Sequence, residues 1–300
     1  MKKIAVFFKQ PGVKDYPFNK SEYWNSYLEL NTEIEKIGAE FYIVRDNTTY
    51  LGNGKFSKSW KFKNGDLVET GEIIVDKIYD KGDFQADNTV SVLNNEFVNE
   101  ICTDKWKTYE LFKEFCPETI LIRNENEFEN ALKKIKSSKK VIKPLDDEKG
   151  NGVFIGKSEY LKNCPHEFPL LVQDFLDTSG GVPGISEEGL HDFRVAILNG
   201  EFLFSFLRTP PKGELMANIA QGGACQIIEK SDIPKSVQKI LSKIETIFGA
   251  YGDYFFGLDV GFVDGIPKII ELNSRVGLQE NARHPIFRNV KVELAKALVK

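Results

Sequence analysis

Histidine and cysteine are scarce in this chain of 300 residues, which contains three histidines and four cysteines. The cysteines are widely separated and form no CxxC pair, so reduced thiols are expected rather than a disulfide framework or a zinc site. The histidines form no HExxH pair. The sequence therefore argues against zinc chemistry and against nucleophilic catalysis that depends on a histidine base.

Blocks of basic residues and long apolar runs are also missing. The 40 Lys and Arg residues are outweighed by 44 Asp and Glu, for a formal net charge of −4. Clustered positive charge is what binds nucleic acids and anionic membranes, so neither is expected as a main partner. The apolar run that ends before Lys9 is too short for a secretory signal, and no stretch approaches a transmembrane span. We expect a globular protein of the cytoplasm.

The first 117 residues alternate strand and helix signals. Short apolar runs at 4–8, 41–44 and 73–79 predict buried strands, and a helical stripe begins at Ser21 and ends near Gly38. Strands that alternate with helices in this way are typical of a parallel sheet with crossover helices. The region is therefore predicted to be an open α/β domain.

The rest of the chain is predicted to be α+β. Thr103 or Asp104 is a candidate helix cap, and Asn124 with Glu127 resembles a capping box. Strands dominate from 141 to 207, a strong helical stripe ends at Gly249, and Asp264-Gly265 predicts a hairpin turn. We divide the chain into domains at 1–117, 118–178 and 179–300.

A lysine and a glycine-containing loop form the first candidate site. Lys143 ends a predicted strand, and the polar loop after it contains Gly150, Asn151 and Gly152. Backbone N–H groups of such a loop can point at phosphate oxygens, which glycine lets come close, and the lysine adds positive charge. Neither the Walker pattern nor a dinucleotide fingerprint is present. The segment is therefore either a phosphate-binding loop or a plain hairpin.

Three oxygen-bearing side chains near the end of the chain form the second candidate. Glu271 and Asn273 are two apart on a predicted strand and leave it on the same face. Asp259 lies on the strand before the hairpin turn, where antiparallel pairing would bring it alongside. Such hard ligands suit a Mg²⁺ ion that also holds phosphates. The alternative is that these polar residues only end strands at a solvated edge.

Two arginines form the third candidate. Arg194 begins a strongly apolar strand and Arg208 ends the next. Packing explains arginines there poorly, whereas binding to phosphate or carboxylate explains them well. A Pro- and Gly-rich loop that follows Arg208 and contains Asn218 is suited to closing over a ligand.

In this order the segments resemble the ATP-grasp superfamily, most of all its prokaryotic-type glutathione synthetases and ribosomal-protein glutamate ligases. The resemblance runs from about Asp104 to Leu278, and the matching stretches are 143–153, 173–176, 192–195, 208–223, 257–259 and 271–274. It implies a pre-ATP-grasp, Rossmann-like α/β domain followed by a two-subdomain α+β ATP-grasp fold. It also implies an ADP-forming carboxylate–amine ligase that makes an amide or peptide bond through an acyl phosphate.

The resemblance also implies roles for individual residues. Lys105 and Lys143 would contact the phosphates of ATP beneath the loop of Gly150, Asn151 and Gly152. The segment that faces adenine and ribose would be Gln173, Asp174, Phe175, Leu176 and Asp177. Asp259, Glu271 and Asn273 would bind two Mg²⁺ ions, with Mn²⁺ as an alternative. Arg194, Arg208 and Asn218 would be the catalytic residues.

Two departures leave the substrates open. Arg275 stands where the family often has a small residue before Pro-Gly, and a glycine-rich segment at 178–190 precedes Asp192. Lys77, Tyr79 and Lys81 end a predicted strand, where open α/β sheets bind ligands. We expect amino acids or short peptides as the carboxylate and amine, and a homo-oligomer is compatible with the resemblance. A small-molecule kinase and a non-catalytic nucleotide-binding regulator are the alternatives.

Overall fold

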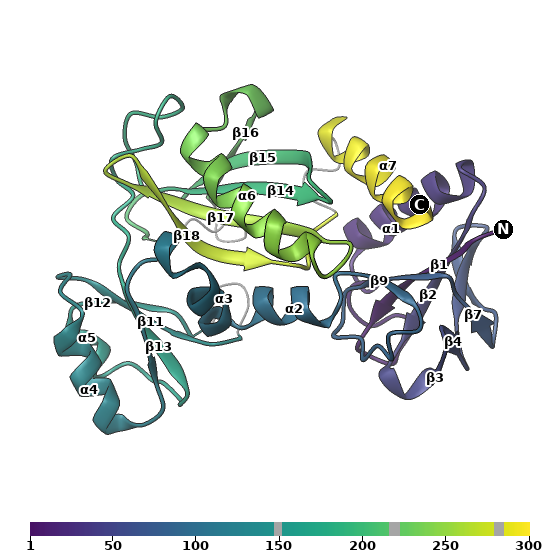
Figure 1. Ribbon diagram of the computed structural model, residues 1–300, viewed down its shortest axis with the longest axis horizontal. Helices are drawn as coiled ribbons and strands as arrows, with labels where there is room; N and C mark the ends of the chain where they lie inside the picture. The colour runs from purple at the N-terminus through teal and green to yellow at the C-terminus, as the bar shows by residue number, and fades with distance from the viewer. Residues whose placement is uncertain (147–151, 216–222, 279–284) are drawn as a thin grey trace.

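The computed structural model describes residues 1–146, 152–215, 223–278 and 285–300. Three main sheets follow one another along the chain, with six, four and five strands. Figure 1 shows the first at one end of the molecule, the second at the other end, and the third above and between them. Among the residues that have assigned positions, none of the helices combines the length and hydrophobicity needed to cross a bilayer.

The first sheet is mostly parallel at its centre, as the alternation of strands and helices predicts. Its order is β6-β5-β2-β1-β8-β9, and β1 pairs in parallel with both β2 and β8. Helix α1 (Ser21–Lys36) is the crossover between β1 and β2, and Gly38 follows it with φ +78°. The strands are β1 (Lys3–Phe8), β2 (Glu40–Arg45), β5 (Trp60–Lys63), β6 (Asp66–Glu69), β8 (Lys77–Asp80) and β9 (Ser91–Leu93).

The strand predicted at 73–79 is divided between two sheets. Its first part, β7 (Ile73–Ile74), pairs with β4 (Lys55–Phe56), which also pairs with β3 (Tyr50–Gly52). The chain then crosses to the main sheet at Asp76, whose carboxylate accepts a hydrogen bond from the Lys3 N–H at 2.7 Å. An apolar run shows that a segment is buried but not which sheet it joins, so this prediction was wrong in detail.

The second sheet is antiparallel, in the order β10-β13-β11-β12. The predicted capping box is present in a modified form: Asn124 Oδ1 accepts from the Glu127 N–H at 3.1 Å, but the Glu127 carboxylate accepts from the N–H of Arg123, one residue before the cap, at 2.8 Å. The elements are β10 (Thr119–Ile122), α4 (Glu125–Lys134), β11 (Lys140–Pro144), β12 (Phe154–Gly156), α5 (Ser158–Leu161) and β13 (Leu170–Asp174).

Two short helices connect the first sheet to the second. Of the two candidate caps, Asp104 is the one that caps α3 (Lys105–Phe112), accepting from the N–H groups of Trp106 and Lys107. The helix before it, α2 (Glu96–Thr103), was not predicted, although Asn95 caps it and its buried stripe includes Val98 and Ile101. Short 3₁₀ turns occur at Asn47–Thr49, Lys113–Phe115 and Lys230–Asp232.

The third sheet carries the hairpin predicted at Asp264-Gly265, whose φ values of +50° and +75° are those of a tight hairpin turn. Its order is β16-β15-β14-β17-β18, all antiparallel. Helices α6, α2 and α3 cover one face, while α7 contacts β15 and reaches back to α1 (Figure 1). The elements are β14 (Asp192–Leu198), β15 (Glu201–Thr209), β16 (Ala224–Ile228), α6 (Lys235–Gly249), β17 (Phe255–Val263), β18 (Ile266–Asn273) and α7 (Pro285–Val299).

Candidate active site

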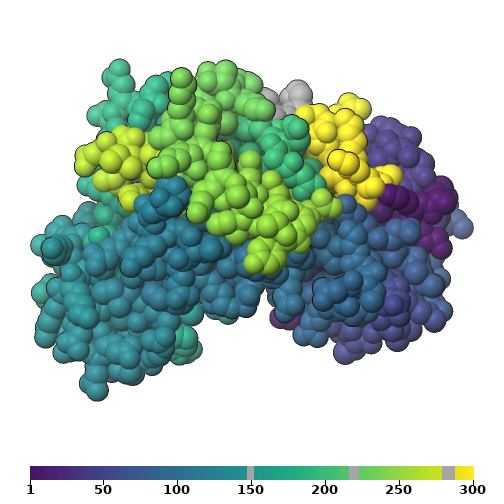
Figure 2. Space-filling model, viewed as in Figure 1, coloured from purple at the N-terminus to yellow at the C-terminus, as the bar shows by residue number. Residues whose placement is uncertain are grey.

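A hollow between α3, β11 and β18 brings together residues that are far apart in the sequence. Four of the predicted site residues line it: Lys105, Lys143, Gln173 and Glu271. The start of α3 is tied to the end of β11, because the Lys105 N–H donates to the Leu145 carbonyl at 3.0 Å. Figure 2 shows a notch at the lower edge of the molecule, between the lobe of the second sheet and the N-terminal lobe.

Lys143 is the most deeply placed cation of this hollow. Only 8% of it is exposed, and its Nζ donates to Gln173 Oε1 at 2.9 Å. Burial lowers the pKa of Lys143 to about 8, Lys105 lowers it further, and Glu271 offsets this only in part. A second positive charge beside a buried lysine is stabilised when an anion lies between the two. The pair is therefore suited to binding phosphate.

A row of charged side chains crosses three strands of the third sheet. Arg194 on β14 lies opposite Asp259 on β17, and Asp259 lies opposite Glu271 on β18. Asn273 is two residues beyond Glu271 on the same strand, opposite Gly257. The structure thus brings the three predicted metal ligands to one face of the sheet, beside Arg194.

A β-bulge makes this arrangement possible. Counting back from the turn, Val260 pairs with Ile269, but Asp259 pairs with Glu271, so Ile270 is an extra residue in β18. Regular pairing would place Asp259 opposite Ile270 and turn Glu271 to the other face, because side chains alternate along a strand. Bulges commonly redirect a side chain next to an active site. The turn residues alone predict the hairpin but not this shift.

Both arginines bind Asp259, a pairing that the sequence did not predict. The Asp259 carboxylate accepts from Arg194 Nε at 2.5 Å and from Arg194 NH2 at 2.6 Å, and Arg208 NH2 donates to Asp259 Oδ2 at 2.7 Å. Burial raises the pKa of Asp259, but the two guanidinium groups outweigh it and hold the pKa at about 2. Asp259 is therefore a fixed negative charge within a positively charged surrounding.

Asp192 is a residue of the site that the sequence reasoning missed. Its carboxylate accepts from Arg208 NH2 at 2.5 Å, and burial together with Asp259 raises its pKa to about 6. Asp192 Oδ1 and Arg208 Nε are buried and have no hydrogen-bond partner in the part of the chain that the structure describes. The signal was the spacing of Asp192 and Arg194, which places both on one face of a strand.

The segment predicted to face a base continues from the hollow. Gln173 uses its side chain on Lys143 and on Thr119, and its backbone lies within the sheet, paired with Thr119 of β10 and Val141 of β11. Further along, the Asp177 carboxylate accepts from the Ser179 N–H at 3.1 Å, and this serine lowers the pKa of Asp177. Asp174, Phe175 and Leu176 lie between these two points.

The glycine loop is described only at its end. Gly152 has φ +65°, and a Cβ there would lie 3.2 Å from the Pro144 ring, so both conformation and space favour glycine. Gly150, Asn151 and Asn218 lie outside the described residues. Elsewhere two predicted ligand contacts were wrong: Tyr79 is fully buried, and Lys77 donates to the Asp253 carboxylate and the Ala297 carbonyl.

The side-chain oxygen atoms of Asp259, Glu271 and Asn273 suit a hard cation that takes most of its ligands from a bound phosphate and water. Among the described residues, no group of three or more His, Cys, Asp or Glu side chains is arranged to hold a metal ion. Two carboxylates and one amide on a common face are nevertheless the oxygen ligands with which proteins hold Mg²⁺ on substrate phosphates. The residues fit a Mg²⁺–phosphate group better than a metal held by protein alone.

A comparison with protein-family models shows to which family the chain belongs. A family model described as the prokaryotic glutathione synthetase ATP-grasp domain matches residues 105–283, more than half of the chain. The chain belongs to this family. The matched region runs from Lys105 past Asn273 and so includes every residue predicted to bind ATP or metal or to act in catalysis.

Curated relatives agree with the family. The glutathione synthetase of Prochlorococcus marinus subsp. pastoris is 29% identical over 148 residues, which cover 47% of this chain and 44% of that protein. A probable alpha-L-glutamate ligase of Legionella pneumophila is 23% identical over 276 residues, 85% of each chain. The chain thus spans less than half the length of the Prochlorococcus protein but most of the Legionella protein.

Solved structures confirm the fold. A D-alanine–D-alanine ligase from Bacillus anthracis has a TM-score of 0.64 and 14% identity, with 100% of this chain and 96% of that chain covered. The whole chain, including its N-terminal sheet, therefore has the architecture of an ATP-grasp protein. The ATP-grasp fold that the motifs implied is confirmed.

Proposed function

We propose that the protein is an ATP- and Mg²⁺-dependent carboxylate–amine ligase that forms an amide or peptide bond and releases ADP and phosphate. The observation that carries this is the row of Arg194, Asp259 and Glu271 beside the hollow of Lys105 and Lys143. Positive charges suited to phosphate adjoin two carboxylates suited to Mg²⁺. Relatives named glutathione synthetase and alpha-L-glutamate ligase support the same reaction class.

Separate groups of residues would bind the nucleotide and the metal ions. Lys105 and Lys143 would hold the phosphates of ATP, and the backbone of 173–176 would receive the adenine, with Asp177 near the ribose. Asp259, Glu271 and Asn273 would hold two Mg²⁺ ions, which neutralise phosphate charge when bound. PsnB, an ATP-grasp ligase with a TM-score of 0.58 to this chain, has been solved with Mg and ADP.

Arg194 and Arg208 would act where negative charge develops. Phosphoryl transfer to a carboxylate gives an acyl phosphate, and attack by an amine gives a tetrahedral oxyanion before phosphate leaves. Asp259 holds Arg194 by two hydrogen bonds, so this guanidinium is already oriented before a substrate arrives. This reaction needs charge and position rather than a histidine base, in agreement with the low histidine content.

The test is ADP release from Mg²⁺-ATP with a panel of amino acids and short peptides, with and without hydroxylamine. A ligase is expected to form a hydroxamate with a particular carboxylate, because hydroxylamine traps acyl phosphates. A phosphorylated product without hydroxamate would identify the alternative kinase. Tight ATP binding without ADP release across the panel would favour the non-catalytic regulator and contradict the proposal.

Lys143 gives a second prediction that needs only the nucleotide. Its pKa of about 8 is below the ordinary lysine value, so at about pH 8.5 most Lys143 side chains are neutral before ATP binds. A phosphate beside the amine raises this pKa, and ATP binding should therefore take up protons. Calorimetry in buffers of different ionisation enthalpy measures this uptake.

The uptake should disappear in Lys143→Met and persist in Lys134→Met, which removes an exposed lysine at the end of α4. Equal proton uptake by wild type and Lys143→Met would show that Lys143 does not contact the phosphates.

A further inference from the structure

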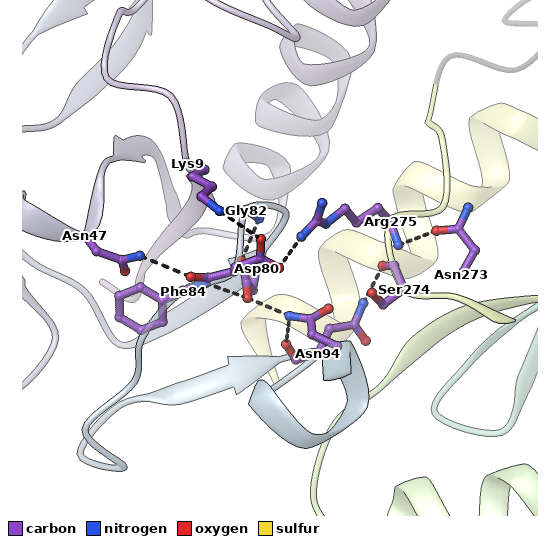
Figure 3. Close-up of polar contacts among 11 residues, drawn as sticks. Lys9, Asn47, Asp80, Gly82, Phe84, Asn94, Asn273, Ser274 and Arg275 are labelled. Carbon is purple, nitrogen blue, oxygen red and sulfur yellow. Dashed lines mark hydrogen bonds and ion pairs between the residues drawn. The ribbon is translucent and has the colours of Figure 1, made fainter. Parts of the chain in front are cut away.

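The turn that follows β18 determines how the amide of Asn273 is oriented. Asn273 is the last residue of β18, and its Oδ1 accepts a hydrogen bond from the Arg275 N–H at 2.7 Å (Figure 3). A carbonyl oxygen has two lone pairs, so Oδ1 can accept this bond and still bind a cation. The direction of this oxygen therefore depends on the backbone of residues 273–275, at whose centre Ser274 lies.

Ser274 lies just beyond the strand pairing that supports β18. The pairing of β17 with β18 ends at Gly257 and Asn273. At this point the side chain of Asn94 bonds to both strands (Figure 3). Its Nδ2 donates to the carbonyls of Phe255 and Ser274 at 2.8 and 2.6 Å, and its Oδ1 accepts from the Phe255 N–H at 2.6 Å. Asn94 thus continues the connection between the two strands where their own ladder stops.

The side chain of Asn94 uses both its donor and its acceptor group in these contacts. A primary amide has two N–H donors and one carbonyl acceptor, and here Nδ2 makes two hydrogen bonds and Oδ1 one. Asn94 is fully buried, and its φ of +63° lies in a region that asparagine tolerates better than most residues. Leaving a buried hydrogen-bonding group unpaired is costly, so this amide holds Phe255 and Ser274 in place.

Asn94 is held in turn by the first sheet. It lies between β9 and α2, and its carbonyl accepts from Asn99 Nδ2 at 2.8 Å. The same Nδ2 donates to the Asp80 carboxylate at 2.6 Å. Asp80 ends β8, is 1% exposed, and also accepts from the N–H groups of Gly82 and Phe84 at 2.7 and 2.9 Å (Figure 3). The position of Asn94 is therefore fixed by a buried polar network.

Two other contacts join this turn to the first sheet, and each is further from the candidate metal ligand or more exposed. Lys81 Nζ donates to the Val276 carbonyl at 2.9 Å, three residues beyond the ligand. The Arg275 guanidinium forms an ion pair with Asp83, and these side chains are 27% and 46% exposed (Figure 3). Exposed ion pairs stabilise little, whereas the Asn94 contact is fully buried and one residue from the ligand.

We propose that Asn94 is a positioning residue for the candidate metal site. This rests on the proposed function, in which Asn273 is a metal ligand. Asn94 acts through Ser274: its amide fixes the Ser274 carbonyl, and the turn of residues 273–275 then holds the Asn273 oxygen in the orientation of a ligand. The first sheet thereby takes part in metal binding, through a residue that precedes the region 105–283 matched by the family model.

The test measures binding of Mn²⁺ in the presence of ADP, from the electron paramagnetic resonance signal of unbound Mn²⁺, and needs no turnover. Asn94→Gly removes the amide and adopts a φ of +63° without strain. It is expected to raise the Kd for Mn²⁺ about ten-fold, the usual effect of losing a group that orients a metal ligand. The Kd for ADP alone, measured in EDTA, should be unchanged.

Lys77→Met is the matched control for a merely structural role. Lys77 is 8% exposed and also joins the first sheet to later parts of the chain, donating to the Asp253 carboxylate and the Ala297 carbonyl at 2.5 and 2.8 Å. This variant should lower the Tm without changing the Kd for Mn²⁺. If Lys77→Met raises the Kd as much as Asn94→Gly does, general loosening between the sheets is the cause and the proposal fails.

Asn273→Ala tests whether Asn94 acts through the ligand. This change should raise the Kd for Mn²⁺ by itself, and adding Asn94→Gly should raise it no further, because changes within one chain of contacts are not additive. An unchanged Kd in Asn94→Gly, or the same fold-increase with and without Asn273→Ala, overturns the role of Asn94.

Failure to fold and failure of the proposed function give different results. If Asn94→Gly does not fold, Asn99→Ala takes its place, because alanine suits α2 and the change removes the bond to the Asn94 carbonyl. It should raise the Kd for Mn²⁺ roughly three-fold, the effect of one lost hydrogen bond, and an unchanged Kd overturns the proposal. A wild type that binds no more Mn²⁺ than ADP does alone overturns instead the metal site on which the proposal rests.

Discussion

Replacing Glu271 by glutamine is expected to lower kcat by a factor of about 100 or more and to leave the Tm unchanged or slightly higher. Loss of one group that stabilises transition-state charge typically costs about 10²–10³ in rate. Burial and the adjacent Asp259 raise the pKa of Glu271, which means that the ionised carboxylate is destabilised in the free protein. Glutamine keeps the shape of the side chain and removes that repulsion.

The measurement is ADP release at saturating substrate, together with thermal unfolding of the same samples. Glu201→Gln makes the same chemical change at an exposed position of the third sheet and should behave as wild type. A Glu271→Gln protein with normal turnover would show that Glu271 is not a metal ligand. A large loss of Tm would mean instead that its role is in the fold.

The sequence predicted the hairpin on which Glu271 lies better than it predicted where Glu271 points. Asp264-Gly265 specifies a tight turn through two residues that tolerate positive φ, and this local requirement is visible in the sequence. The extra residue at Ile270 satisfies no local preference. It is seen only in the pairing of β17 with β18, yet it decides whether Glu271 shares a face with Asp259.

The same difference between local and long-range interactions explains which other predictions were confirmed and which were wrong. The caps at Asp104 and Asn124 are local hydrogen bonds and were predictable from single residues. The division of 73–79 between two sheets and the pairing of Arg194 with Asp259 depend on segments distant in the chain. One sequence shows which residues carry charge but not which charges meet.

Replacing Asp259 by asparagine is expected to abolish activity and, unlike Glu271→Gln, to destabilise the fold. Asp259 is 1% exposed and accepts hydrogen bonds from both Arg194 and Arg208. Removing one partner of a buried ion pair leaves uncompensated charge and costs about 3 to 5 kcal/mol. For a chain of this size that lowers the Tm by roughly 5 to 15 °C.

The fall in stability at acidic pH (the acid limb of the curve of stability against pH) gives an independent check of the ion pair between Asp259 and the two arginines. The pKa of Asp259 is about 2 in the folded protein, below its value of about 4 in the unfolded chain. The ionised carboxylate therefore stabilises the fold above about pH 4, and this contribution to stability is lost as the pH falls toward 2. Asp259→Asn should therefore lose less stability than wild type between about pH 4 and 2.

Asp264→Asn is the matched control, because it makes the same change in the exposed hairpin turn, where φ is +50° and asparagine is tolerated. Both the Tm and the acid limb of this variant should match those of wild type. If Asp259→Asn instead kept the wild-type Tm, the two arginines would not depend on Asp259 for their charge balance. The row from Arg194 to Glu271 would then be assembled by the backbone of the sheet alone.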